Sequence, residues 1–295
     1  MSTAPTLAEA TPLWAARATL GEGPLWSSRL GRIFFVDIRG RRILSCALDG
    51  SAAAEWPMEH RPCWIIETTR ADHFLVGLER SIVILRLIPG EPAEILHRLP
   101  GEFAEGLRLN DAKAGPGGEV YFGTMDDAEE AATGHFHILA ADGSATRIDQ
   151  DYTVSNGPAV SPDGRTVYHT DSPARTVYVF DRDHDGSLTG KRVHIRFTEA
   201  DGYPDGMTCD AEGGLWVCHW DGGRVTRFLP DGTRDRAITL PVSRVTSCAF
   251  AGPGLDHLVI TTAAFGREAE PLAGTLFVAM PGIQGLAAHR SGFTS

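Results

Sequence analysis

The sequence lacks a long apolar run and a recognisable export signal. No apolar segment approaches the ~20 residues that a helix needs to cross a bilayer. Residues 1–20 contain no basic stretch followed by an apolar one, so a cleaved secretion signal is not expected. We therefore expect a cytoplasmic protein with no membrane partner.

Basic residues and paired cysteines are also scarce. Lys and Arg number 27 against 38 Asp and Glu, which gives a net charge of -11. Because nucleic-acid affinity depends on Lys and Arg neutralising phosphates, no nucleic-acid partner is expected. The 5 cysteines include no CxxC pair, which argues against a disulfide framework or a cysteine-bound zinc site and favours buried, reduced thiols.

Several common motifs of enzymes and binding proteins are absent. There is no GxSxG nucleophile elbow and no HExxH zinc motif. GEGPLW and GPGGEV lack the third glycine of a dinucleotide fingerprint. DRDHDG, which begins at Asp181, resembles half of an EF-hand loop but has Arg192 at the twelfth position, so it is expected to be a hairpin turn.

The sequence does contain a six-fold internal repeat. Each copy begins with a small or polar loop and continues as two short strands separated by Gly- or Pro-containing turns. The first residues of the copies, here called the anchors, are spaced by 41, 47, 46, 49 and 42 residues, a period typical of a four-stranded propeller blade. The anchors are Glu22, Cys63, Asn110, Asn156, Asp205 and Ser247.

These observations predict an all-β protein, a six-bladed β-propeller with four-stranded blades that spans residues 1–295 as one domain. Eight Asp-Gly pairs supply the turns that hairpins need. A β-sandwich is the competing architecture, but it does not explain a six-fold recurrence of this length. A strand at 13–18 is expected to close the last blade beside a strand at 274–280, which would pair both free edges.

The anchors carry the chemistry of the predicted fold. Equivalent positions of a propeller are related by rotation about its axis, so the anchors are expected to face one another across the channel. Glu22, Asn110, Asn156 and Asp205 offer carboxylate or amide oxygens there. Asn and Asp before Gly are also ordinary turn residues, and it is their matching phase that favours a site. Oxygen ligands of this kind favour a hard or borderline divalent ion, so one Ca²⁺, Mg²⁺, Mn²⁺, Fe²⁺ or Zn²⁺ ion is expected.

Four motifs at these positions resemble the gluconolactonase, regucalcin and senescence-marker-protein family of six-bladed propellers. They are GEGPLW, RLNDAKAGPGG, SNGPAVSPDGRTVYHTD and YPDGMTCDAEGGLWV, and TSCAFAGPGLDHLVITTA extends the likeness to the sixth repeat. VYHTDS and the DDAEE segment are more similar to bacterial pentose-lactone enzymes than to the animal gluconolactonases.

The resemblance implies a role for particular residues. Glu22, Asn156 and Asp205 match the metal ligands of the family, and Asp205 also matches its general base. Arg108 and Asn110 match residues that hold sugar hydroxyls. The family also uses a Glu shortly after GTM, for which Glu129 and Glu130 are the two candidates.

The predicted function is metal-dependent opening of an aldonolactone to the aldonic acid by a monomer whose partner is a small sugar lactone. An open-site metal polarises a carbonyl and acidifies its bound water, which suits hydrolysis. Two alternatives remain: a promiscuous metal-dependent esterase or organophosphate hydrolase, and a non-catalytic calcium-binding propeller. His169, His219 and Trp64 are further candidates for the lining of the channel.

Overall fold

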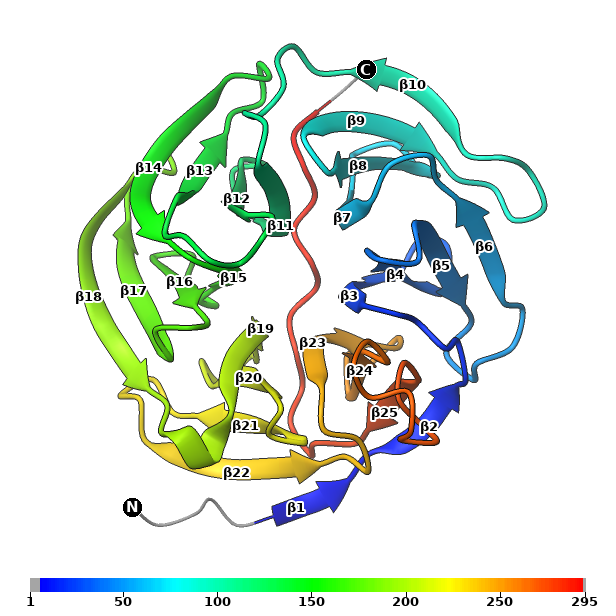
Figure 1. Cartoon of the computed structure of the whole chain (residues 1–295), viewed down its shortest axis with the longest axis vertical. Coiled ribbons are helices and arrows are strands. Elements are labelled where there is room, and N and C mark those ends of the chain that lie inside the picture. Colours follow the sequence, from blue (N-terminus) through cyan, green and yellow to red (C-terminus); the bar gives the residue numbers. More distant parts are fainter. Residues whose placement is uncertain (1–5, 294–295) are drawn as a thin grey trace.

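Six antiparallel sheets surround a central axis in the computed structural model, which describes residues 6–293 (Figure 1). Four sheets contain the strands of one sequence repeat, and the other two also take one strand each from the N-terminal segment. The repeat is therefore the blade, and the prediction of a six-bladed propeller is confirmed. The only helix in this part of the chain is the short η1 (Glu199–Asp201), and none has the length and hydropathy of a membrane span. Residues 1–5, part of the segment examined for a secretion signal, and residues 294–295 lie outside the described range.

The innermost strand of every blade begins at or just before its anchor, so all six anchors lie at the same end of the channel. The innermost strands are β3 (Gly21–Ser27), β7 (Pro62–Glu67), β11 (Leu107–Ala114), β15 (Ser155–Val160), β19 (Tyr203–Cys209) and β23 (Val245–Ala251).

The other strands follow outward in chain order. The second strands are β4 (Arg32–Asp37), β8 (His73–Leu78), β12 (Val120–Asp126), β16 (Thr166–Asp171), β20 (Leu215–Trp220) and β24 (His257–Thr262). The third strands are β5 (Arg42–Cys46), β9 (Ser81–Arg86), β13 (Gly134–Leu139), β17 (Thr176–Arg182), β21 (Arg224–Phe228) and β25 (Leu276–Ala279). The outer strands of blades one to five are β6 (Ala54–Pro57), β10 (Glu94–Arg98), β14 (Ala145–Tyr152), β18 (Leu188–Arg196) and β22 (Arg234–Thr239).

The ring is closed by the N-terminal part of the chain, as predicted. β2 (Thr11–Trp14) is the outer strand of the sixth blade and pairs antiparallel with β25. The strand begins and ends earlier than the expected 13–18, because Ala18 already donates its N–H to Gly274 in a loop. β1 (Thr6–Glu9) was not predicted, and it adds a fifth strand, parallel to β22, to the fifth blade.

The core lies between the blades. Neighbouring innermost strands pack against each other around the whole ring, and large buried rings fill the space behind them. Phe34 of the first blade and Phe74 of the second, for example, have ring centroids 4.6 Å apart. All 5 cysteines are free and buried, which agrees with the expected reduced thiols.

The C-terminal segment 281–293 crosses the channel at the end where the innermost strands finish (Figure 1). Ser291 forms a bridge with Thr68, directly after β7, and Gly285 forms one with Asp210, directly after β19. Arg290 donates to Glu67 at 3.0 Å. This segment, called the strap below, therefore covers the end of the channel opposite the anchors.

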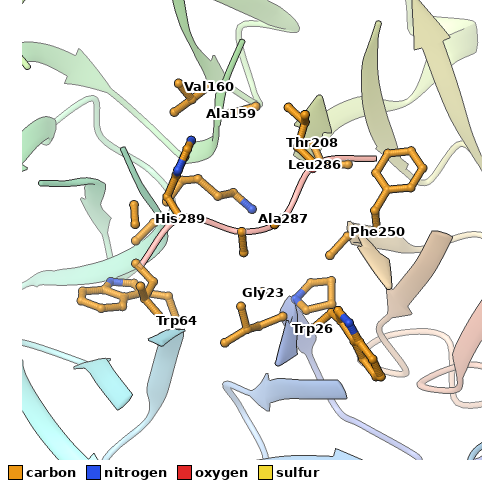
Figure 2. Close-up of a pocket in the computed structure, with 18 of the residues that line it drawn as sticks. Gly23, Trp26, Trp64, Ala159, Val160, Thr208, Phe250, Leu286, Ala287 and His289 are labelled. Atoms are coloured by element: carbon orange, nitrogen blue, oxygen red, sulfur yellow. The ribbon is translucent and has the colours of Figure 1, made fainter. Parts of the chain in front are cut away.

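A small cavity of about 80 Å³ lies beneath this strap (Figure 2). Its walls are mostly apolar and include Trp26, Trp64 and Phe250, with His289 contributed by the strap (Figure 2). None of its lining residues is a carboxylate, so it lacks the charged oxygen ligands that a hard metal ion prefers.

Candidate active site

A local irregularity marks the anchor in every blade. The pairing register between the innermost and second strands shifts at or next to each anchor, for example between Glu22 and Leu25 and between Asn156 and Ala159. The same holds in the remaining four blades. Because a bulge bends the strand and re-aims a side chain, six aligned bulges are a structural reason for the anchors to converge.

A glycine follows the anchor at three of these six bulges. Gly23 and Gly157, which follow Glu22 and Asn156, have φ of 54° and 66°, a region that side chains rarely adopt. Gly206, after Asp205, meets a different constraint: a Cβ atom there would lie 2.3 Å from Oγ of Ser247 in the next blade.

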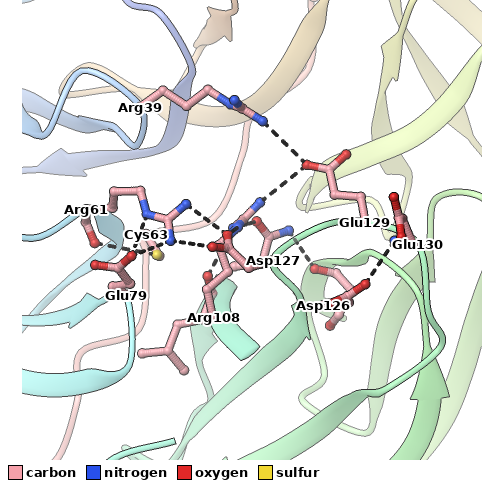
Figure 3. Close-up of polar contacts among 12 residues, drawn as sticks. Arg39, Arg61, Cys63, Glu79, Arg108, Asp126, Asp127, Glu129 and Glu130 are labelled. Atoms are coloured by element: carbon pink, nitrogen blue, oxygen red, sulfur yellow. Dashed lines mark hydrogen bonds and ion pairs between the residues drawn. The ribbon is translucent and has the colours of Figure 1, made fainter. Parts of the chain in front are cut away.

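At the anchor end, the structure brings six of the seven predicted site residues around one cavity of about 300 Å³. They are Glu22, Arg108, Asn110, Glu129, Asn156 and Asp205. Glu130 does not line the cavity, and its backbone N–H binds Asp126 at 2.9 Å (Figure 3). Of the two glutamates, Glu129 is therefore the one that lines the cavity.

A chain of hydrogen bonds holds the amides of the cavity. Arg108 donates to Oδ1 of Asn110 at 2.5 Å, and Nδ2 of Asn110 donates to Oδ1 of Asn156 at 2.6 Å. Nδ2 of Asn156 donates to Ser172 at 2.9 Å, and Ser172 donates onward to the carbonyl of Pro204 at 2.6 Å. The chain thus fixes the orientation of Asn156 from both sides and leaves its Oδ1 with one free lone pair.

The carboxylates are buried close to one another. Burial raises the pKa of Glu22 well above its usual value, and the charges of Asp205 and Asp111 raise it further. Burial likewise raises the pKa of Asp205, with a further contribution from Asp111. Burial raises the pKa of Asp111 to about 6. Such a cluster is stabilised in its charged form only by a nearby positive charge.

The residues present fit a hard divalent cation. Oδ1 of Asp205 is buried and has no hydrogen-bond partner among the described residues, an arrangement that calls for a missing partner. Glu22 supplies a second carboxylate and Asn156 an amide oxygen, all lining the same cavity. Residues 6–293 contain no cluster of three His, Cys, Asp or Glu side chains placed to hold a metal, so the amide of Asn156 is needed to complete the set.

Three arginines from consecutive blades converge on the loop after β12 (Figure 3). Arg61 forms ion pairs with Asp127 at 2.8 Å and with Glu79. Arg108 lies 3.4 Å from Asp127, and Arg39 lies 3.8 Å from Glu129. These contacts hold Glu129 over the cavity.

Three other candidates lie elsewhere. His169 is fully buried, contacts Ser155 at 2.9 Å and stacks on Tyr152. His219 is also fully buried and contacts the carbonyl of Asp201. Both are packing residues. Trp64 lines the cavity beneath the strap (Figure 2) and not the cavity at the anchor end.

Comparison with known proteins identifies the family. The model of the SMP-30/gluconolactonase/LRE-like region matches residues 20–264. The chain belongs to this family. The family assigned from the four motifs is thus confirmed.

Named relatives within the family cover nearly the whole chain. An L-arabinolactonase of Azospirillum brasilense is 34% identical over 96% of this chain and 95% of the relative. A pentonolactonase of Haloferax volcanii is 32% identical over 86% of this chain and 84% of the relative. Among solved structures, a calcium-binding regucalcin of Agrobacterium tumefaciens matches with a TM-score of 0.88 and 25% identity over 100% of both chains.

The structure adds residues to the site that sequence reasoning did not find. Asp111, Arg39, Tyr203, Trp220 and Phe265 lie at or near the cavity. Asp111 directly follows the anchor Asn110, so the sequence repeat already indicated a position near the site. The other four lie in loops or at strand ends outside the phase of the anchors, so the repeat carries no information about them.

Proposed function

We propose that this sugar lactonase opens aldonolactones to aldonic acids with one divalent cation held by Glu22, Asn156 and Asp205. The observation that carries the proposal is the buried, unpartnered Oδ1 of Asp205 beside a second carboxylate and a pre-oriented amide oxygen. A bound divalent cation would polarise the lactone carbonyl and lower the pKa of water.

The side chains of the chain supply the remaining functions. We assign Asp205 a second role as the general base that accepts a proton from the attacking water, since its carboxylate lines the cavity and one of its oxygens has no hydrogen-bond partner within the protein. Arg108 and Glu129 lie beside the cavity with charged hydrogen-bonding groups for sugar hydroxyls. Asn110 already donates both amide hydrogens to the protein, so its remaining contribution to substrate is one lone pair on Oδ1.

The cavity also supports a polyhydroxy substrate over an aryl ester. Tyr203, Trp220 and Phe265 line it, but arginine guanidinium groups cover one face of each ring, at 4.2, 4.4 and 3.8 Å from the centroids. Rings occupied in this way offer less apolar surface for a second aromatic ring. The names of the L-arabinolactonase and the pentonolactonase relatives support pentonolactones as the first substrates to test.

The proposal is tested by acid release from a panel of pentono- and hexonolactones after chelation and return of each divalent metal. Asp205→Ala is expected to lose nearly all metal-dependent turnover while circular dichroism and thermal unfolding remain close to wild type. Calorimetric titration with Ca²⁺, Zn²⁺ and Mn²⁺ is expected to show weakened metal binding in the same variant.

Asp185→Ala is the matched control, because Asp185 is an exposed turn aspartate outside the cavity. It removes a carboxylate of the same kind and is expected to keep wild-type turnover. Full metal-dependent activity in Asp205→Ala would contradict the assignment of Asp205. Aryl esters and an organophosphate in the same panel test the esterase alternative, and metal binding without turnover of any substrate would favour the calcium-binding one.

A further inference from the structure

Arg39 is placed at the mouth of the cavity by a rigid turn. It follows β4, where the buried carboxylate of Asp37 accepts hydrogen bonds from the backbone N–H groups of Thr19, Leu20 and Gly40 at 2.9 to 3.0 Å. The turn is therefore tied to the preceding loop on one side and to its own second half on the other. These hydrogen bonds fix the backbone that carries Arg39.

The side chain of Arg39 joins two distant blades across the mouth. Its guanidinium carbon lies over the ring of Phe265 of the sixth blade, 3.8 Å from the centroid. The guanidinium also reaches Oε1 of Glu129 of the third blade at 3.8 Å (Figure 3). All three residues line the cavity. Glu129 is held in turn by Arg108 at 3.9 Å and has a φ of 62°, which fixes its direction out of the loop.

We propose that Arg39 is a specificity-determining residue. Its bridge to Glu129 limits the number of exocyclic carbons that a substrate lactone can have. This inference rests on the proposed function. In this proposal the lactone ring binds at the carboxylates, and its exocyclic carbons extend toward the bridge. Short lactones fit beneath the bridge, whereas longer ones must displace it.

The ion pair between Arg39 and Glu129 is weak, so a longer lactone can displace the bridge at a cost in binding free energy. Arg39 and Glu129 have side chains that are 41% and 47% exposed, and exposed pairs of this kind contribute little to stability. Stacking on Phe265 keeps the guanidinium in place without locking it. Removal of Arg39 is therefore expected to change selectivity without unfolding the protein.

The test compares lactones that share a ring and differ by one exocyclic carbon. L-Arabinono-1,4-lactone and D-galactono-1,4-lactone form one such pair, and D-xylono-1,4-lactone and D-glucono-1,4-lactone form another. Wild-type enzyme is expected to prefer the pentonolactone of a pair at least tenfold in kcat/KM. Arg39→Ala is expected to reduce this preference about tenfold, through a gain on the hexonolactone, with the pentonolactone changed less than threefold.

Arg41→Ala is the matched control, since Arg41 is an exposed arginine in the same turn and outside the cavity. It removes the same charge and is expected to leave the preference unchanged. An equal preference in Arg39→Ala and wild type would overturn the inference, as would an equal rise in KM for both members of a pair, which would show that Arg39 holds the common ring. Absence of any lactone turnover in the wild type would instead reject the proposed function.

Discussion

Asn110 illustrates how one residue orders several neighbours in the site. It occupies an anchor position, but its amide donates to the carbonyl of Ser155 and to Asn156 of the next blade, and it accepts from Arg108 of its own strand. Fixed in this way, the donors and acceptors of the cavity need little reorganisation when a substrate binds. Such preorganisation is the main contribution of a protein scaffold to polar catalysis.

Arg108 is the residue whose removal best separates substrate binding from metal binding. In Arg108→Ala, loss of a charged hydrogen-bond donor is expected to cost about 1.5–3 kcal/mol of substrate affinity. KM on the preferred lactone should therefore rise roughly ten- to hundredfold, with a smaller change in kcat. Steady-state kinetics at saturating metal measure this split.

Metal titration of the same variant provides the complementary readout. Arg108 lowers the pKa of both Glu22 and Asp205 through its charge, but it is not a proposed ligand. Divalent-cation affinity is therefore expected to be kept or slightly increased when this competing positive charge is removed. Loss of metal binding in Arg108→Ala would contradict the role assigned to it.

The sequence predicted those site residues that obey the repeat. Glu22, Asn156 and Asp205 could be found because rotation brings equivalent positions together, and their convergence on one cavity follows from that rule. Arg39 and Phe265 could not be found, because each lies in a loop of individual length and conformation. The choice between Glu129 and Glu130 needed backbone geometry, since adjacent residues in a loop have no fixed direction until its hydrogen bonds are known.

At the scale of elements, the bulges connect strand pairing to the site. A regular strand would point the side chain of its anchor to one of the two faces of the blade. The bulge next to each anchor inserts extra backbone and turns the side chain toward the axis. Three of the six anchors, Glu22, Asn156 and Asp205, are followed by a glycine, so these glycines belong to the site although they carry no functional group.

Gly206→Ala tests this connection in the fifth blade. The added methyl group would lie 2.6 Å from Cβ of Ser247 and 3.0 Å from its Cα. Because backbone resists displacement, the cost is expected to be about 1–3 kcal/mol of unfolding free energy, and Asp205 should shift with its neighbour. Chemical denaturation and metal titration measure the two effects.

A compensating change distinguishes steric strain from a general loss of fold. Ser247→Gly removes the side-chain atoms that the new methyl group would contact. The double variant Gly206→Ala/Ser247→Gly is expected to recover part of the lost stability and of the metal affinity. A double variant with additive losses would show that the close approach of these two strands is not the constraint.

The sequence predicted the strands that recur in the blades, but it did not predict segments without a counterpart in another blade. The short alternating runs between turn signals became the blade strands, and the DRDHDG segment forms the expected turn between β17 and β18, where Gly186 donates to the carbonyl of Asp183. β1 and the C-terminal strap were missed. Neither has a counterpart in another blade, and each is held largely by main-chain contacts to segments far away in sequence.

For the whole molecule, closure of the ring determines whether the site exists. Glu22 is on the first blade, Asn156 on the fourth and Asp205 on the fifth, so no single blade contains the complete set of proposed ligands. The first and sixth blades meet at β3 and β23, and Thr246 donates to the carbonyl of Gly21 at 2.6 Å across this contact. Opening the ring at this point would displace Glu22 from the other two ligands.

Two N-terminal truncations test the role of closure. Deletion of residues 1–9 removes β1, an addition to a blade that already has four strands, whereas deletion of residues 1–15 also removes β2 and leaves the edge of β25 unpaired. The shorter deletion is expected to keep lactonase activity and most of the thermal stability. The longer one is expected to unfold at a markedly lower temperature, to lose metal-dependent turnover and to associate through the free edge, which light scattering detects. Equal stability and activity of the two truncated chains would show that β2 is not what holds the first and sixth blades together.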